Sequence, residues 1–359
     1  MAGGHLLLTA DAVGGVWQYS TDLAAALQPF GWEVTLATMG PPLSEVQRSE
    51  AAAIPNLQVV ETGLELDWLA TDAASVLAAE TRLAELAADL RVDLVQLHTP
   101  ALVSAGRYAC PVVAVLHSCV ATWWSAVKEG PMPADFAWRS GLVQHGLKRA
   151  MLAVAPSAAF AQMAHLHYGV VPLAVHNGRF LLVRPRAMED SVFTAGRLWD
   201  EGKNLGVLDE VADRLALPFN AAGPVSGPGG ASIRFRALQP LGTLDTGALA
   251  DQLASKPLFV SAALYEPFGL AVLEAAIAGC ALILSDIPTF RELWDGAAIF
   301  VDPNDAHGFV SAINETIENV AARQEAGRRA QKRARRYTPA AMAATMARHY
   351  AALQRRAAA

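Results

Sequence analysis

Short, mainly apolar segments alternate along this chain with longer segments of helical periodicity. The segment 5–10 (HLLLTA) is followed by Gly14-Gly15, by apolar residues at helical spacing over 16–30, and by a second apolar segment at 32–38. A strand, a glycine turn, a helix and a second strand in this order form a βαβ unit, in which the strands are parallel. The repeated alternation therefore predicts α/β domains with doubly wound sheets.

The alternation runs through the chain twice, which predicts two domains of the same class. In the first cycle the strand-like segments lie at 5–10, 32–38, 57–62, 92–98, 110–117 and 151–157, and a long helix is expected over 70–90. In the second cycle the strand-like segments lie at 191–197, 257–263, 281–286 and 297–302, and helices are expected over 205–217, 270–278 and 306–320. A chain of 359 residues is long enough for two such domains.

The boundaries follow from where the two cycles begin and end. We expect a first domain over 1–172, a linker over 173–190, a second domain over 191–336 and a C-terminal segment over 337–359. In that last segment Thr338 is the expected N-cap of a helix, and Pro339 suits the first helical position.

Composition excludes several classes of protein. A chain with 53% hydrophobic and 17% charged residues is not disordered. The net charge of −6 argues against binding to duplex nucleic acid. The three cysteines form no Cys-x-x-Cys pair, so neither a zinc site nor a disulfide framework is indicated. Because the first residues also lack the features of a signal peptide, we expect a cytoplasmic protein.

Two stretches of unusual charge require an interpretation. Residues 150–178 contain no Asp, Glu, Lys or Arg and are long enough to span a bilayer. Prolines, glycines and histidines interrupt them, however, so a buried helix and strand are favoured over a transmembrane helix.

Residues 323–336 contain seven Arg or Lys and one Glu. We favour the solvated C-terminal end of a helix over a patch that binds lipid or nucleic acid.

The segment YEPFGLAVLEAAIAGCALILSD (265–286) carries the pattern with the most chemical content. Glu266 lies in a loop after a strand-like segment, and Glu274 lies eight residues later on the next helix, among apolar residues. A buried carboxylate needs a partner, and the vicinal hydroxyls of a ribose can both donate to it. The free N–H groups where the helix starts, near Gly269 and Leu270, suit a phosphate. The alternative is two ordinary glutamates, one capping a helix and one with its stem on apolar surface.

This segment resembles the Glu-x7-Glu signature of the retaining GT-B glycosyltransferases of family GT4, and the resemblance extends over most of the chain. The other segments that resemble the family are Gly14-Gly15 with the helix after it, VAPS (154–157), VHNG (175–178), TAGRLWDEGKN (194–204), and IPTFREL (287–293) through VDPND (301–305). The resemblance implies two Rossmann-like domains that face each other across a cleft. It also implies that the final helix, 339–353, crosses back onto the first domain.

The resemblance further implies roles for residues of the second domain. Arg197 and Lys203 would hold the donor diphosphate, since fixed cations stabilise the negative charge that a departing diphosphate gathers. Glu274 would bind the ribose, and Glu266 would contact hydroxyls of the transferred sugar. Without the resemblance, Arg197 and Lys203 could equally be solvated cations at the end of a strand. Their place directly after an apolar strand favours the binding role.

In the first domain the resemblance concerns a glycine pair and a histidine. Gly14 and Gly15 would let the backbone approach the diphosphate or the acceptor, although a glycine pair alone is more often a turn. His117 follows the strand-like segment 111–116 and resembles the family's cleft histidine, while His98 also ends a strand and is the competing candidate. A neutral imidazole can donate to one sugar hydroxyl and accept from another.

Three tryptophans lie just after His117 in the sequence. Trp123, Trp124 and Trp138 could form a platform for an acceptor sugar, because aromatic rings pack against the apolar faces of sugars. Packing in the core is the commoner explanation. The region 119–146 around them shows no pattern of the family, and neither does 223–242, which is rich in Gly and Pro and lies where contacts to the nucleotide base are expected.

Motifs that the chain lacks narrow the reaction further. There is no Asp-x-Asp motif, with which metal-dependent glycosyltransferases hold a divalent ion. Arg and Lys would take the place of that metal. There is also no G-x-x-x-x-G-K-[ST] and no G-x-G-x-x-G after a strand, which disfavours a P-loop NTPase and a dehydrogenase.

We therefore expect a metal-independent, retaining hexosyltransferase that needs no cofactor. It would move a sugar from a nucleotide-diphospho sugar to a hydroxyl of a sugar, a lipid-linked molecule or another small molecule. Because lipid acceptors are common in the resembling family, we also expect peripheral contact with the inner membrane face, and no nucleic-acid partner. The alternatives are a nucleotide-sugar epimerase or phosphorylase on the same fold, and a two-domain binder of the periplasmic type, against which the missing export signal argues.

Overall fold

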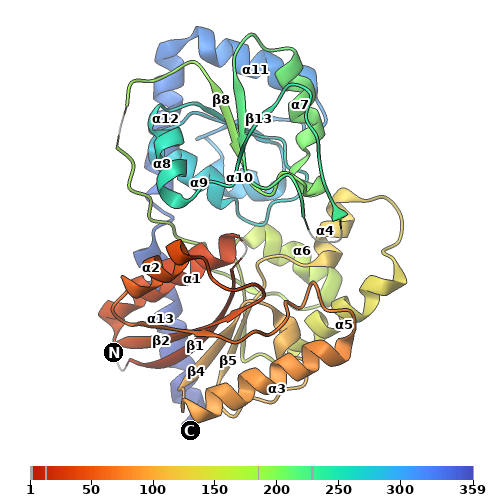
Figure 1. The fold of residues 1–359 in the computed structure, drawn as a ribbon, viewed down its shortest axis with the longest axis vertical. Helices are drawn as coiled ribbons and strands as arrows, with labels where there is room; N and C mark the ends of the chain where they lie inside the picture. Colours follow the sequence, from red (N-terminus) through yellow and green to blue (C-terminus); the bar gives the residue numbers. More distant parts are fainter. Residues whose placement is uncertain (1–2, 13, 185, 228–229, 359) are drawn as a thin grey trace. The chain divides into compact units, whose positions relative to one another are not determined.

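The computed structural model describes residues 3–12, 14–184, 186–227 and 230–358 and divides the chain into two compact units. The first unit comprises Met1–Gly178 together with Thr338–Ala359, and the second comprises Arg179–Tyr337. Figure 1 shows both units, with the C-terminal helix in dark blue within the first. The chain thus passes from one unit to the other after Gly178 and again after Tyr337.

The first unit is built on a seven-stranded parallel sheet with the strand order β3-β2-β1-β4-β5-β6-β7. The strands are β1 (Gly4–Asp11), β2 (Trp32–Met39), β3 (Leu57–Glu61), β4 (Leu94–Leu97), β5 (Val112–Val115), β6 (Leu152–Ala155) and β7 (Leu173–Ala174). The strand order reverses between β1 and β4. In open α/β sheets, ligands bind beyond the carboxyl ends of the strands at such a reversal.

Helices cover this sheet. They are α1 (Gly15–Leu27), α2 (Glu45–Ala52), α3 (Ala73–Asp89), α4 (Val120–Val127), α5 (Ala134–Arg149), α6 (Ala158–Tyr168) and α13 (Pro339–Ala357). Helix α13 packs beside α1, and the ring of its Tyr350 lies edge-on to Trp32 in the buried core. The hydroxyl of Thr338 caps α13 by accepting from the N–H of Ala341, as predicted, and Pro339 begins the helix.

The second unit contains a six-stranded parallel sheet with the order β10-β9-β8-β11-β12-β13, which reverses between β8 and β11. The strands are β8 (Val192–Ala195), β9 (Phe219–Ala222), β10 (Gln239–Gly242), β11 (Leu258–Ser261), β12 (Leu282–Ser285) and β13 (Ile299–Val301). Both sheets are therefore parallel and doubly wound, which confirms the predicted fold class.

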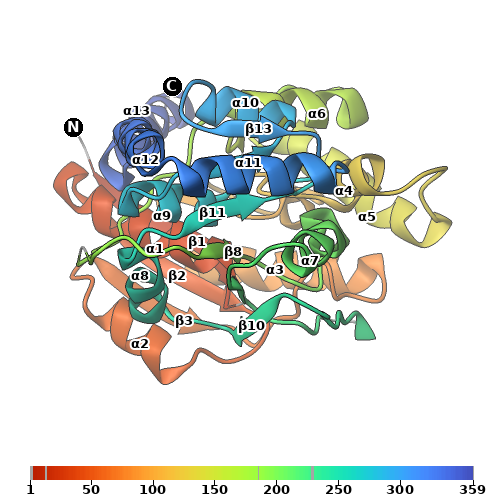
Figure 2. The same cartoon turned by 90° about the horizontal axis from the view of Figure 1, so that it is seen from above.

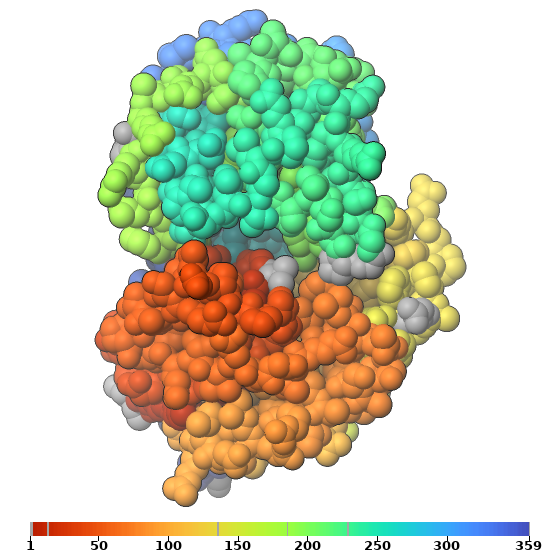
Figure 3. Space-filling view, in the orientation of Figure 1, coloured from red at the N-terminus to blue at the C-terminus, as the bar shows by residue number. Residues whose placement is uncertain are grey.

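Helices flank the second sheet on both faces (Figures 1 and 2). They are α7 (Leu205–Asp213), α8 (Thr246–Ala254), α9 (Leu270–Ala278), α10 (Pro288–Trp294), α11 (Ala306–Glu318) and α12 (Val320–Ala334). One buried cluster joins the sheet to α8, α9 and α10, and another joins it to α7 and α11. Along one side of this unit, the lime-green segment that follows Arg179 lies at the surface (Figure 3). Phe180 and Leu182 are exposed there.

Several expectations differ from the structure. The expected linker over 173–190 begins with a strand, because Leu173 and Ala174 pair with β6 as the last strand of the first sheet. Strands β9 and β10 were not expected from the sequence. Pro240 and Gly242 in β10 weaken any strand pattern, and such residues are tolerated there because β10 lies at the sheet edge.

The two stretches of unusual charge form ordinary elements. Residues 150–178 contain β6, α6 and β7, and no described helix has the length and apolar character needed to cross a membrane. The basic stretch lies largely on the exposed face of α12, as predicted. Arg323 is an exception, because its side chain is buried. It donates to Asp190 Oδ1 at 2.8 Å and to the backbone oxygens of Glu189 and Lys256.

Candidate active site

A loop at the carboxyl end of β8 presents both predicted cations of the second unit. Asp200 holds this loop, because its Oδ1 accepts from the N–H of Gly202 at 2.9 Å and its Oδ2 from the guanidinium of Arg197 at 3.1 Å. The side chain of Arg197 is about half exposed, whereas that of Asp200 is buried. Arg197 is therefore anchored at one end and open to a ligand approaching from solvent.

Asn204 fixes the other end of the loop. Its backbone adopts the left-handed conformation (φ 56°), and its side-chain amide donates to the backbone oxygens of Ala262 and Pro303 at 3.1 and 2.8 Å. Neither Asp200 nor Asn204 was among the predicted site residues. An Asp two residues before a Gly and an Asn before a helix are turn signals that could have identified them.

Lys203 and Glu266 form an ion pair in which the lysine Nζ donates to Glu266 Oε2. Both side chains are largely buried, and the loops that carry them are joined because the oxygen of Gly202 accepts from the N–H groups of Leu264 and Tyr265. The structure therefore brings together two predicted site residues that are 63 positions apart in the sequence. The ion pair adjoins a small recess at the carboxyl ends of β8 and β11.

The start of α9 lies beside this pair. Gly269 precedes the helix with φ 87°, and a Cβ atom there would lie 3.3 Å from Cγ of Glu266 and 3.2 Å from Phe290. Glycine avoids both the backbone strain and this crowding. Among the described residues no side chain caps α9, so the N–H groups of its first turn, near Leu270, suit an anion.

Glu274 lies further along α9 and is 7% exposed. Its Oε1 accepts from Nε of Arg179 at 2.7 Å, in an ion pair whose two side chains are almost completely buried. Burial raises the pKa of Glu274, and the charge and hydrogen bond of Arg179 oppose that rise. The sequence predicted that Glu274 needs a partner, but it gave no sign that Arg179, 95 residues earlier, provides one.

In the first unit, Gly14 and Gly15 lie at the strand-order reversal after β1, where Gly14 is the N-cap of α1 and Gly15 is its first residue. Both are exposed, and Gly14 has φ 116°, which a residue with a side chain rarely adopts. Within the part of the chain that the structure describes, no side chain caps α1, so its first turn also offers backbone N–H groups. This geometry is compatible with the close approach of a ligand to the backbone.

His98 and His117 follow β4 and β5 and lie edge-on to each other, with ring centroids 5.0 Å apart. Tyr19 lies edge-on to both rings. Burial lowers the pKa of His117 to about 4 and the pKa of His98 well below its usual value. Both imidazoles are therefore neutral at pH 7.

The two histidines differ in their hydrogen bonds. His98 Nε2 lies 2.9 Å from Nε2 of Gln96, and His98 Nδ1 lies 3.2 Å from the hydroxyl of Ser20. The Ser20 hydroxyl donates to the oxygen of Val16 at 2.7 Å, so it accepts from His98, which must carry its proton on Nδ1. By contrast, Nε2 of His117 is buried and has no hydrogen-bond partner in the described part of the chain. This contrast favours His117 over His98 as the histidine that meets a ligand.

The chain of hydrogen bonds through His98 begins on the C-terminal helix. The hydroxyl of Tyr350 donates to Oε1 of Gln96 at 2.5 Å, and Gln96 then donates through Nε2 to His98. The chain ends on the first turn of α1, beside Gly14 and Gly15. It therefore connects α13 with the glycine loop through the buried side chains of Tyr350, Gln96 and Ser20 and the partly buried ring of His98.

Trp123 and Trp124 lie in α4, and Trp138 lies in α5. The rings of Trp123 and Trp124 are 6.4 Å apart, and the guanidinium of Arg139 lies 4.4 Å from the ring of Trp138. All three are partly exposed. Core packing therefore explains only part of their surface, and the acceptor platform remains a prediction.

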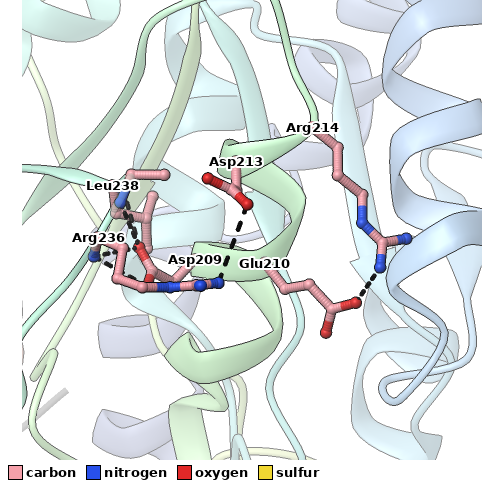
Figure 4. Close-up of polar contacts among 7 residues, drawn as sticks. Asp209, Glu210, Asp213, Arg214, Arg236 and Leu238 are labelled. Atoms are coloured by element: carbon pink, nitrogen blue, oxygen red, sulfur yellow. Dashed lines mark hydrogen bonds and ion pairs between the residues drawn. The ribbon is translucent and has the colours of Figure 1, made fainter.

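A carboxylate on α7 organises the stretch 223–242, of which Pro228 and Gly229 lie outside the described residues. Asp209 accepts from three successive backbone N–H groups, those of Arg236, Ala237 and Leu238, at 2.9–3.1 Å (Figure 4). Burial raises the pKa of Asp209, but these three donors outweigh it and hold the pKa below its usual value. Asp209 thereby fixes the segment that leads into β10.

Comparisons with known proteins identify the family. The family model described as Glycosyltransferase Family 4 matches residues 13–178, and that described as Glycosyl transferases group 1 matches residues 237–333. A curated relative, glycogen synthase from Mycobacterium tuberculosis, is 25% identical, and the match covers 89% of this chain and 86% of the relative.

Solved structures show the same fold. Sucrose-phosphate synthase from Thermosynechococcus elongatus has a TM-score of 0.80 and 17% identity, with 97% of this chain and 98% of the other chain covered. HepE from Anabaena in complex with UDP-glucose has a TM-score of 0.73 and 15% identity, with 97% and 100% covered. The two family models together account for well over half of the sequence. The chain therefore belongs to the group 1 glycosyltransferases of family GT4, transferase enzymes with two Rossmann-like domains of the GT-B fold.

Proposed function

We propose that this glycosyltransferase moves a sugar from a nucleotide-diphospho sugar to a hydroxyl acceptor, without a metal ion and with retention of the anomeric configuration. One observation carries the proposal. The carboxyl edge of the second sheet gathers Lys203, Glu266 and the uncapped start of α9, with Arg197 on the same loop as Lys203. Cations, free N–H groups and a carboxylate in one place suit a diphosphate joined to a sugar.

The cations act on the leaving group. When the bond at the anomeric carbon breaks, negative charge gathers on the departing diphosphate. Lys203 and Arg197 stabilise that charge together with the N–H groups near Gly269 and Leu270, and removal of one such contact typically slows an enzyme about 10²–10³-fold. In the unliganded protein Glu266 balances the charge of Lys203. A bound diphosphate takes over that balance.

The two glutamates act on hydroxyls. When the diphosphate binds Lys203, the ion pair between Lys203 and Glu266 weakens. The Glu266 carboxylate then accepts hydrogen bonds from hydroxyls of the transferred sugar. Glu274 accepts from the ribose hydroxyls, for which an ionised carboxylate is suited because it offers two acceptor oxygens. The first unit contributes Gly14 and Gly15, whose backbone meets the diphosphate or the acceptor, and His117, whose neutral ring binds a sugar hydroxyl.

Retention requires the incoming hydroxyl and the leaving phosphate to lie on the same face of the sugar. The acceptor hydroxyl then passes its proton to the departing phosphate oxygen, so the chain itself needs no general base. We further propose a cytoplasmic location and, as acceptor, a sugar, a lipid-linked molecule at the inner membrane face or another small molecule. The donor to test first is UDP-glucose, because the similar HepE structure holds it.

The test is a donor panel. Purified protein is incubated with UDP-, GDP- and ADP-glucose in the presence of EDTA and candidate acceptors, and released nucleoside diphosphate and glycosylated product are measured. The proposal predicts product in which NMR finds the anomeric configuration of the donor. An inverted product would refute retention, and donor consumption without any glycosylated acceptor would indicate an epimerase or phosphorylase instead.

A further inference from the structure

Arg179 is the first residue of the second unit, and its side chain is 5% exposed. Its Nε donates to Oε1 of Glu274. Its backbone N–H donates, at 3.2 Å, to the backbone oxygen of Tyr337, which is the last residue of the same unit. Arg179 is thus held through both its side chain and its backbone. No feature of the family resemblance or of the comparisons assigns it a role.

The geometry leaves one oxygen of Glu274 available. Oε1 is occupied by Arg179, whereas Oε2 has no hydrogen-bond partner within the described ranges and is not completely enclosed. The second oxygen is therefore the atom that a ligand can reach. Because the carboxylate is held through Oε1, Oε2 has a fixed position before the ligand arrives, which reduces the entropy lost on binding.

The ion pair with Arg179 also favours the ionised form of the Glu274 carboxylate. A carboxylate buried without a cation takes up a proton, because the charged form loses its hydration. A protonated Glu274 would lose one of its acceptor oxygens and compete as a donor. Arg179 counters this by its charge at 2.7 Å.

We propose that Arg179 is a positioning residue for the donor: it holds Glu274 through Oε1 so that the ionised Oε2 accepts from the ribose hydroxyls of the nucleotide. This inference rests on the proposed function of Glu274. The competing idea is that Arg179 occupies the place of the ribose and must leave before the nucleotide binds. The two ideas predict opposite effects when the cation is removed.

The experiment measures binding of UDP, GDP and ADP by calorimetry at pH 6.5 and pH 9, so it does not depend on finding the acceptor. For whichever nucleotide binds the wild type, Arg179→Met is expected to weaken binding about 10-fold or more at pH 6.5. Part of that loss should be recovered at pH 9, where the unpaired Glu274 ionises. Arg179→Lys, which keeps the charge, should stay within about 3-fold of the wild type.

Two variants separate this role from a merely structural one. Glu274→Gln should weaken binding equally at both pH values. Adding Arg179→Met to it should cause no further loss of nucleotide affinity, since the proposal has Arg179 act on the nucleotide through Glu274. The double variant also leaves no unpaired buried charge, so it tests the inference even if Arg179→Met alone does not fold. Arg186→Met is the matched control, because Arg186 pairs at 3.5 Å with Asp251 at the surface.

The inference is overturned if Arg179→Met binds the nucleotide as well as or better than the wild type at pH 6.5 while Glu274→Gln binds weakly. It is also overturned if Arg179→Met weakens binding further in the Glu274→Gln background. If Glu274→Gln binds normally, the proposed role of Glu274 itself is wrong, and the inference about Arg179 is lost with it. The outcomes therefore distinguish failure of the inference from failure of the proposed function.

Discussion

The hydroxyl of Tyr350 is the start of the hydrogen-bond chain that runs through Gln96 and His98 to α1, and Tyr350→Phe removes this hydroxyl without changing the ring. Tyr350 and Gln96 are both completely buried. The substitution removes one hydrogen bond, worth about 1 kcal/mol, and leaves Gln96 Oε1 buried without a donor, which adds a desolvation cost of about 1–3 kcal/mol. We therefore expect the free energy of unfolding to fall by about 2 kcal/mol after partial relaxation.

The assay is urea and thermal unfolding followed by tryptophan fluorescence. For a unit of this size, 1 kcal/mol shifts the Tm by about 2–4 °C, so the Tm should fall by about 4–8 °C. Tyr108→Phe is the control, because the Tyr108 hydroxyl is buried and has no hydrogen-bond partner in the structure as described. Its removal should leave stability unchanged or raise it. If Tyr350→Phe and Tyr108→Phe had the same Tm, the hydrogen-bond chain would not contribute to stability as argued.

Three further predictions concern the candidate site. Lys203→Ala should lower kcat about 100-fold or more with an unchanged circular dichroism spectrum. Arg214→Ala is the control and should not change kcat, because Arg214 forms an exposed pair with Glu210. A kcat of Lys203→Ala equal to that of the wild type would exclude Lys203 from the reaction. Because the pKa of Asp209 is lowered in the folded protein, its carboxylate stabilises the fold above the usual carboxyl pKa, and this contribution is lost as the pH falls through the folded value. The stability gap between the wild type and Asp209→Asn, measured by urea unfolding, should therefore be largest near neutral pH and close in acid; a constant gap would contradict this. Because burial lowers the pKa of His117 to about 4, His117→Gln should lower kcat/KM without changing its pH dependence over about pH 5–8. The prediction would be contradicted if kcat/KM of the wild type changed with pH near the usual histidine pKa and this change were absent in His117→Gln.

Local sequence patterns predicted the elements that carry the site. The helix expected over 270–278 has these bounds in the structure, because Gly269 and Gly279 both adopt the left-handed conformation and end it on either side. The apolar segments before Gly14 and before Arg197 are strands β1 and β8, since strands buried on both faces are continuously apolar. Patterns of this kind report burial and local backbone conformation, which the chain determines over a few residues.

The remaining features depend on contacts between distant segments. Arg179 meets Glu274, and Asp209 meets the N–H groups of 236–238, only because the second sheet brings their elements together. Neither pairing leaves a periodic or compositional trace. Strand β10 depends in the same way on its neighbour β9, since its own residues are exposed and poor strand formers. These features become visible only when the fold is known.

In the proposed reaction, side chains and a helix start in the second unit, rather than a divalent ion, neutralise the departing diphosphate. The decisive measurement is turnover of the preferred nucleotide sugar by metal-stripped protein in EDTA, with and without added Mg²⁺ or Mn²⁺. We expect the same kcat in all three conditions. Loss of turnover in EDTA that either ion restores would contradict it.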